Sequence, residues 1–175
     1  MATNLQFIKE VTNNAGRITS LSITDCFPSE YKIFQIFCDA VTYADIARQV
    51  DVRLIDSGGS VISDNEYQYA RKQLRSNASF NENKSTGDTN WDRPFCTNDN
   101  NPAPAVGVLT LFNPNDSSSF TFAISQGASM NGSTGLRGAK FIGVHKSAET
   151  ITGLQIFNSD NAMDSGTRLT VYGVK

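Results

Sequence analysis

A two-residue alternation of apolar and polar side chains is the feature that most limits how this chain can fold. In residues 167–174 (TRLTVYGV), Leu169 and Val171 point to one side of an extended backbone, whereas Thr170 and Tyr172 point to the other. This is the period of a β-strand and not the 3.6-residue period of a helix. We therefore expect this last strand to lie inside a sheet and to close the fold.

The same alternation recurs between turn signals along the chain. Residues 49–56 (QVDVRLID) alternate, and residues 31–40 (YKIFQIFCDA) are apolar on both faces, as a central strand sandwiched between layers would be. Residues 106–112 and 119–126 flank the turn sequence NPND and predict a hairpin. About eight or nine short strands, with turn signals roughly every ten residues, predict an all-β fold, a single-domain antiparallel β-sandwich or jelly roll over residues 1–175.

One segment has the signature of a helix. Ser63 and Glu66 stand at the Ser-x-x-Glu spacing of a capping box, in which each side chain satisfies a free backbone donor of the first turn. Tyr67, Ala70 and Leu74 then repeat at intervals of three and four residues. This spacing predicts a short surface helix over residues 64–75.

Two further segments complete the expected layout. Residues 78–105 have almost no periodicity and predict a long loop, a kind of segment that is often functional. Residues 151–157 (ITGLQIF) form another strand-like run, and a run rich in Asn, Asp, Ser and Gly separates it from the last strand. We therefore expect a closing hairpin over residues 151–175.

The expected long loop contains the only tryptophan of the chain. Trp91 is followed by Asp92, Arg93 and Phe95, so that two aromatic rings flank a pair of opposite charges. Such a cluster is typical of a contact surface, and we predict that these four residues bind a partner. An alternative stays open, in which Trp91 and Phe95 pack beneath the loop and hold it in place.

Charge and hydropathy exclude several classes of protein. The net charge of −2 and the scattered Lys and Arg residues argue against binding of nucleic acid. No stretch approaches the roughly 18 apolar residues of a membrane span, and the start of the chain lacks the layout of a signal peptide. We expect no membrane association. The three cysteines, Cys26, Cys38 and Cys96, are expected to be reduced, and the first two to be buried.

Residues for reaction chemistry are sparse. His145 is the only histidine, and no Cys or Asp stands near it at ligand spacing, so we interpret it as a structural or surface residue. Phosphate-binding glycine motifs are absent from the sequence. The glutamates show no paired arrangement of the kind used in glycoside hydrolysis, although distant strands can supply such pairs. We expect no enzyme, no cofactor, no metal and no catalytic residues.

The order of several motifs along the chain resembles a known group of proteins. The start MATNLQFI is followed by SLSITDCF, VDVRLIDSGGSVISDNEYQYAR, LTLFNPNDSSSFTF, IGVHKSAETITGLQIF and the final GTRLTVYGVK. This series resembles small virion structural proteins of marine tailed phages such as cyanophages. The resemblance covers nearly the whole chain except residues 78–105, and it implies a non-enzymatic part of the particle.

What the resemblance leaves open is the place in the particle. A compact chain without a coiled-coil stalk favours a capsid decoration or cement protein on the outside of the head over a stand-alone fibre. Its partners would be other virion proteins, above all the major capsid protein, in a homo-oligomer or symmetric array assembled in the host cytoplasm. The alternative is a tail- or fibre-associated module that binds a receptor or carbohydrate through the Trp91 cluster. A small β-sandwich hydrolase is a third hypothesis.

Overall fold

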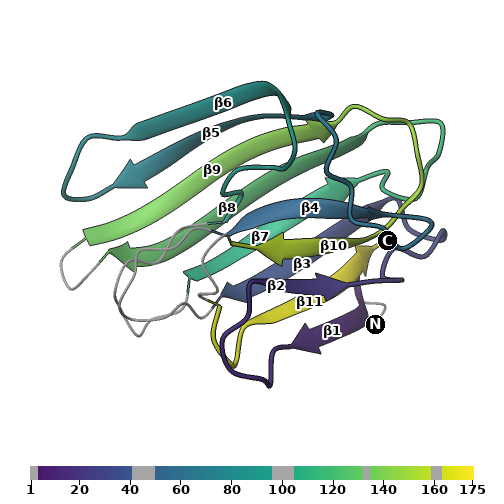
Figure 1. Ribbon diagram of the computed structural model, residues 1–175, viewed down its shortest axis with the longest axis horizontal. Coiled ribbons are helices and arrows are strands. Elements are labelled where there is room, and N and C mark those ends of the chain that lie inside the picture. Colours follow the sequence, from purple (N-terminus) through teal and green to yellow (C-terminus); the bar gives the residue numbers. More distant parts are fainter. Residues whose placement is uncertain (1–3, 41–49, 96–104, 132–134, 159–162) are drawn as a thin grey trace.

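The protein is an all-β, antiparallel sandwich. The computed structural model describes residues 4–40, 50–95, 105–131, 135–158 and 163–175, and within them the chain forms eleven strands and no helix (Figure 1). The expected fold class is therefore confirmed. No helix that could cross a lipid bilayer occurs in this part of the chain.

The strands form two sheets of unequal width (Figure 1). The wide sheet contains eight strands in the spatial order β1 (Leu5–Thr12), β11 (Arg168–Val174), β3 (Ile33–Ala40), β7 (Ala105–Phe112), β8 (Thr121–Asn131), β9 (Gly135–His145), β5 (Tyr67–Arg75) and β6 (Asn81–Asp88). The narrow sheet contains three strands in the order β2 (Ser20–Ile23), β10 (Ile151–Phe157) and β4 (Asp51–Asp56).

The core lies between the two sheets. The central strand β3 turns Phe34, Ile36 and Cys38 inward, whereas Phe37 on its other face is 39% exposed. The expectation that layers cover both faces of this strand is therefore wrong, because the narrow sheet packs on one face of the wide sheet. The narrow sheet supplies the opposing side chains, among them Val52, Leu54, Ile151, Leu154 and Ile156. Each fully buried apolar side chain of this size contributes roughly 1.5–3 kcal/mol to stability, so the contact between the sheets dominates the folding energy.

The predicted hairpin of β7 and β8 is confirmed, with Phe112 paired to Phe122 next to the turn. The predicted alternation of residues 49–56 is confirmed as well, because Val50, Val52 and Leu54 are all buried. Cys26 and Cys38 are buried free thiols, as expected. Burial raises the pKa of Cys26 to about 12, and it also raises the pKa of Cys38. Cys96 lies outside the described residues.

The predicted helix over residues 64–75 is wrong, because this segment forms strand β5. Its side chains alternate with period two, and the inward-facing ones are Tyr67, Tyr69, Arg71 and Gln73. Two of the buried positions are polar, which hid the alternation and left Tyr67, Ala70 and Leu74 as an accidental helical pattern. Arg71 can be buried because its Nε lies 2.9 Å from Asp92 Oδ2, which compensates the loss of hydration.

The predicted closing hairpin over residues 151–175 is also wrong. Strand β10 lies in the narrow sheet between β2 and β4, whereas β11 lies in the wide sheet between β1 and β3. The chain therefore crosses from one sheet to the other after β10, as chains do in Greek-key sandwiches. The expectation that the last strand lies inside a sheet is confirmed, because β11 has a partner on each side.

The segment 78–105, predicted as a loop, contains strand β6. Within the described segments, this strand is an edge of the wide sheet and pairs only with β5, and its side chains are mostly exposed and polar. A polar edge strand with both faces wet has no hydrophobic alternation to recognise. Residues 96–104 of the predicted loop lie outside the described residues.

Gly153 allows β10 and β2 to approach each other closely. A Cβ added at Gly153 would lie 2.3 Å from the carbonyl oxygen of Ile23 and 2.9 Å from Cα of Thr24, and both contacts are to backbone. We expect Gly153→Ala to lower the free energy of unfolding by about 1–3 kcal/mol, measured by urea denaturation. Gly16→Ala is the matched control, since a Cβ there meets nothing within 4 Å. Equal stability of the two variants would contradict this account.

Candidate functional site

The outer face of the wide sheet, which we call the open face, carries a row of apolar side chains. The narrow sheet packs on the opposite face (Figure 1). Strand register places six apolar residues side by side across β9, β8, β7, β3, β11 and β1, namely Val144, Phe122, Phe112, Ile33, Val174 and Leu5. We call these six residues the apolar row.

The apolar row and its neighbours are accessible to solvent. Phe122 is 48% exposed, and the next residues along β8 and β9 on the same face, Ile124 and Ile142, are 48% and 60% exposed. Farther across the sheet, Phe7 is 53% exposed. Single exposed apolar residues are common on proteins, but a contiguous patch of them marks an interaction surface.

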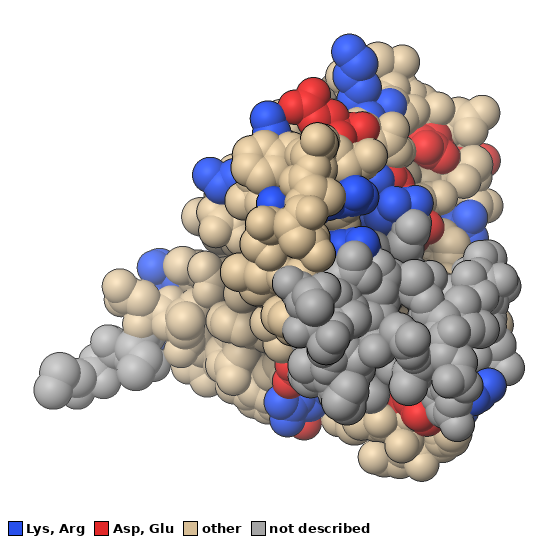
Figure 2. All heavy atoms as spheres, turned by 90° about the vertical axis from the view of Figure 1, so that its left-hand side faces the viewer, with Lys and Arg blue, Asp and Glu red and all other residues tan. Residues whose placement is uncertain are grey.

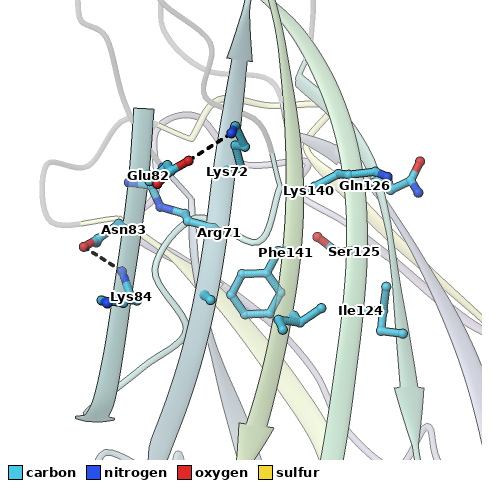
Figure 3. Close-up of a pocket in the computed structure, with 12 residues that line it drawn as sticks. Arg71, Lys72, Glu82, Asn83, Lys84, Ile124, Ser125, Gln126, Lys140 and Phe141 are labelled. Atoms are coloured by element: carbon cyan, nitrogen blue, oxygen red, sulfur yellow. Dashed lines mark hydrogen bonds and ion pairs between the residues drawn. The ribbon is translucent and has the colours of Figure 1, made fainter. Parts of the chain in front are cut away.

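Residues of β5, β6, β8 and β9 line a groove of about 730 Å³ on the open face. Ala70, Ile124 and Ile142 line it together with Lys72, Glu82, Lys84 and Lys140 (Figure 3). We call this hollow the basic groove. An adjoining hollow of about 780 Å³ shares Ile124 and Ile142 with it and reaches Phe112, Phe122 and Val144 of the apolar row.

The charges on the open face are unevenly distributed. The charged residues of the basic groove are three lysines, Arg71 and one glutamate, and Lys72 Nζ lies 2.9 Å from Glu82 Oε1 (Figure 3). This hydrogen bond and the lysine charge lower the pKa of Glu82. Figure 2 shows Lys and Arg side chains gathered with acidic ones on the upper part of the left-hand end of Figure 1.

At the far side of the same sheet, near β1, β11 and β3, the balance of basic and acidic side chains changes. Arg168 Nη2 lies 2.8 Å from Asp39 Oδ2, and this contact raises the pKa of Arg168. Thr170 Oγ1 donates a hydrogen bond of 3.0 Å to Glu10 Oε2. The open face is therefore basic at the groove and weakly acidic at β1, β11 and β3, with the apolar row spanning both parts.

The two rings of the predicted Trp91 cluster lie in the core. Trp91 is 0% exposed and Phe95 is 1% exposed. The Trp91 ring meets the rings of Tyr67 and Phe141 edge to face, with centroid distances of 5.5 Å and 6.0 Å. This position matches the alternative in which both rings pack beneath the segment, and it leaves no ring surface for a partner.

Glycines in the wide sheet provide the space for these rings. A Cβ on Gly143 would lie 2.8 Å from Trp91 Nε1, and a Cβ on Gly107 would lie 2.7 Å from Phe95 Cδ1. The backbone of Trp91 also exchanges two hydrogen bonds with Val52, of 3.1 Å and 3.0 Å. The segment thus joins the edge strand β4 of the narrow sheet and covers the inner face of the wide sheet.

Asp92 and Arg93, both half-buried, belong to a charged cluster that the sequence did not indicate. Asp92 Oδ2 accepts hydrogen bonds from Arg71 Nε at 2.9 Å and from Asn83 Nδ2 at 2.8 Å. The backbone N–H of Arg93 donates a bond of 3.0 Å to Asp51 Oδ1. Burial, together with the charge of Asp92, raises the pKa of Asp51 to about 6 from its usual 3.8. Burial also lowers the pKa of Arg93. Binding of a partner by these residues stays a prediction.

The raised pKa of Asp51 makes stability depend on pH. The folded protein holds the Asp51 proton more tightly than the unfolded chain does, so this contribution to stability is lost as the pH rises through about 6. We expect the free energy of unfolding, taken relative to Asp51→Asn, to fall by about 1–3 kcal/mol between about pH 4 and pH 7. Asp64→Asn, at an exposed carboxylate, is the control and should keep the wild-type profile. Parallel profiles for the wild type and Asp51→Asn would refute the assignment.

His145 lies with two glutamates at the end of β9. Its side chain is 0% exposed, and its Nε2 lies 2.9 Å from Glu149 Oε1 and 3.7 Å from Glu66 Oε2. These three ligand-type atoms lie within 4.8 Å of one another, so the residues could hold a metal ion. Sequence reasoning missed the group because it considered only Cys and Asp near His145 and assigned Glu66 to a helix cap. The four-residue spacing of His145 and Glu149 was the available signal.

No protein-family model and no curated protein matches this chain. Among solved structures, the CBM2 module of the Lactobacillus casei BL23 phage J-1 evolved Dit is similar at 9% identity and a TM-score of 0.27, over 89% of this chain and 68% of that one. The infectious bursal disease virus Gx strain (10% identity, TM-score 0.16) and an infectious bursal disease virus VP2 subviral particle (11%, 0.18) each match 97% of this chain. The match spans 39% and 40% of those two chains. These proteins come from a phage and a virus, and the similarity to each is weak.

Proposed function

We propose that this protein is a non-enzymatic structural component of a phage virion, a capsid decoration protein that binds the outside of the head. The observation that carries the proposal is the apolar row on the open face of the wide sheet. Apolar surface of this extent gains free energy when it leaves water, which an association with another protein provides. The resemblance of the sequence to virion structural proteins of tailed phages supports the same role.

The open face has the anatomy of a protein contact. The apolar row crosses the sheet near one end of its strands, and charged side chains lie farther along the same face, so that apolar and charged surface adjoin as they do in protein interfaces. Phe122, Ile124 and Ile142 are each about half exposed, so burying what remains would contribute roughly 1 kcal/mol per side chain. Such modest single contacts suffice for a protein that binds a rigid lattice as a symmetric array of copies.

The charges of the open face indicate what kind of surface on the head would be complementary to it. Lys72, Lys84 and Lys140 line the basic groove. A complementary surface on the major capsid protein would therefore present carboxylates opposite these lysines and apolar side chains opposite the apolar row. Such complementarity sets orientation and speeds association more than it adds affinity.

A charge placed among the apolar residues of the open face should weaken binding. Ile124→Lys puts an ammonium group among apolar residues, and we expect it to lower the affinity for purified heads that lack this protein by at least about tenfold in co-sedimentation. Ser22→Lys adds the same charge on β2 of the narrow sheet, at another exposed position, and should bind as the wild type does. Circular dichroism confirms that both variants fold.

Two results would overturn the proposal. One is wild-type binding of heads by a folded Ile124→Lys variant. The other is gold labelling, or a density map of the intact particle, that locates the chain on the tail. The second result would favour a tail-associated module, which a glycan array with the isolated chain would then examine for carbohydrate binding.

A further inference from the structure

A buried histidine faces two partly exposed carboxylates where the two sheets are connected. His145 is the last residue of β9, Glu149 lies in the connection from β9 to β10, and Glu66 immediately precedes β5. The Glu149 and Glu66 side chains are 31% and 40% exposed, whereas His145 is fully buried. These three residues form a site separate from the proposed contact surface, since none of them belongs to the apolar row or the basic groove.

The geometry points to a binding site for a divalent transition-metal ion of the Zn²⁺ class, with His145 Nε2, Glu149 Oε1 and Glu66 Oε2 as ligands. Zn²⁺ takes ligands at about 2.0–2.2 Å, so the ligand atoms of a tetrahedral site lie about 3.3 Å apart. The observed separations of 2.9 Å and 3.7 Å from Nε2 bracket this value. The two partly exposed glutamates can adjust by small rotations, and they leave a path for the ion to enter.

The donor set selects the kind of ion. One imidazole nitrogen and two carboxylate oxygens suit Zn²⁺ and its first-row neighbours, whereas Ca²⁺ and Mg²⁺ prefer oxygen ligands alone and more of them. A divalent cation would also balance the two negative charges of Glu66 and Glu149. Three protein ligands leave a fourth position to water.

An independent observation concerns the other nitrogen of the imidazole ring. When Nε2 binds a metal, Nδ1 carries the proton and needs an acceptor behind the ring. His145 Nδ1 is buried and has no hydrogen-bond partner among the residues that the structure describes, and the same is true of Thr121 Oγ1. Thr121 lies directly opposite His145 in the pairing of β8 with β9. A change of the Thr121 side-chain rotamer that brings Oγ1 to Nδ1, or one buried water between the two atoms, would supply the acceptor and satisfy both atoms.

The position of the site gives the ion a structural role. The His145 ring lies against the ring of Tyr67 at a centroid distance of 5.0 Å. The Tyr67 hydroxyl in turn accepts a hydrogen bond from Leu54 N at 2.9 Å and donates one to Ile62 O at 3.1 Å. A metal at His145 would therefore fasten the β9–β10 connection and the start of β5 to the point where the two sheets meet.

Titration of the full chain with Zn²⁺ after treatment with a chelator tests the site. We expect calorimetry to show one ion per chain, and Tm to rise by about 5–10 °C at a free Zn²⁺ concentration one hundred times the Kd. Glu149→Gln and Glu66→Gln should each weaken Zn²⁺ binding by at least about tenfold. Both positions are partly exposed, so the variants should fold, whereas substitution of the buried His145 would disturb the core.

Glu30→Gln is the matched control, because Glu30 is an exposed glutamate in the turn before β3 and should leave Zn²⁺ binding unchanged. Replacement of Zn²⁺ by Co²⁺ gives an absorption spectrum that distinguishes nitrogen and oxygen ligands from thiolates. A thiolate-to-cobalt charge-transfer band would overturn the assignment by placing the ion on a cysteine. It would equally be overturned if the wild type failed to bind Zn²⁺, or if both Gln variants bound it as the wild type does. None of these outcomes depends on binding to heads.

Discussion

The fold depends on how a sheet of eight strands is covered by a sheet of only three. A β-sheet with apolar side chains on its inner face must bury that face, and β2, β10 and β4 are too few to do so alone. The Trp91 segment completes the cover by hydrogen bonding to the edge strand β4 and inserting two rings above Gly143 and Gly107. Asp92, which follows Trp91, then forms an ion pair with Arg71, which faces inward from β5. A segment that looked like a contact arm is thus part of the core.

The same difference in width explains the candidate function. The narrow sheet protects one face of the wide sheet, and the other face keeps an apolar row that solvent reaches. Phe122 and Ile142 on that face are about half exposed, whereas the inner positions of the same strands supply the core. Contact with another molecule would bury what remains exposed of these side chains, which is why the open face carries the proposal of a virion contact.

The three residues of the proposed metal site come together through strand pairing. His145 and Glu149 are close in sequence, but Glu66 approaches them only because β5 pairs with β9 and brings the start of one strand to the end of the other. The backbone N–H of Lys146 donates to the carbonyl of Glu66 at 2.9 Å, which fixes this approach. In the sequence, the spacing of Glu66 indicates a helix cap. In the structure, the pairing of β5 with β9 places the same carboxylate beside the His145 imidazole.

The sequence by itself determined the fold class and most of the strands, because alternation reports directly which side chains a strand can bury. It also indicated that β3 is central, since apolar residues occur on both of its faces. Tertiary structure alone decided what alternation does not report: which sheet a strand joins, whether a polar residue such as Arg71 is buried, and which distant side chains meet. The sequence did not predict strand β5, because Arg71 can be buried only when the fold brings a partner such as Asp92 to it. The sequence also did not predict that β10 and β11 lie in different sheets, because turn residues show where the chain reverses but not which strand the next segment pairs with.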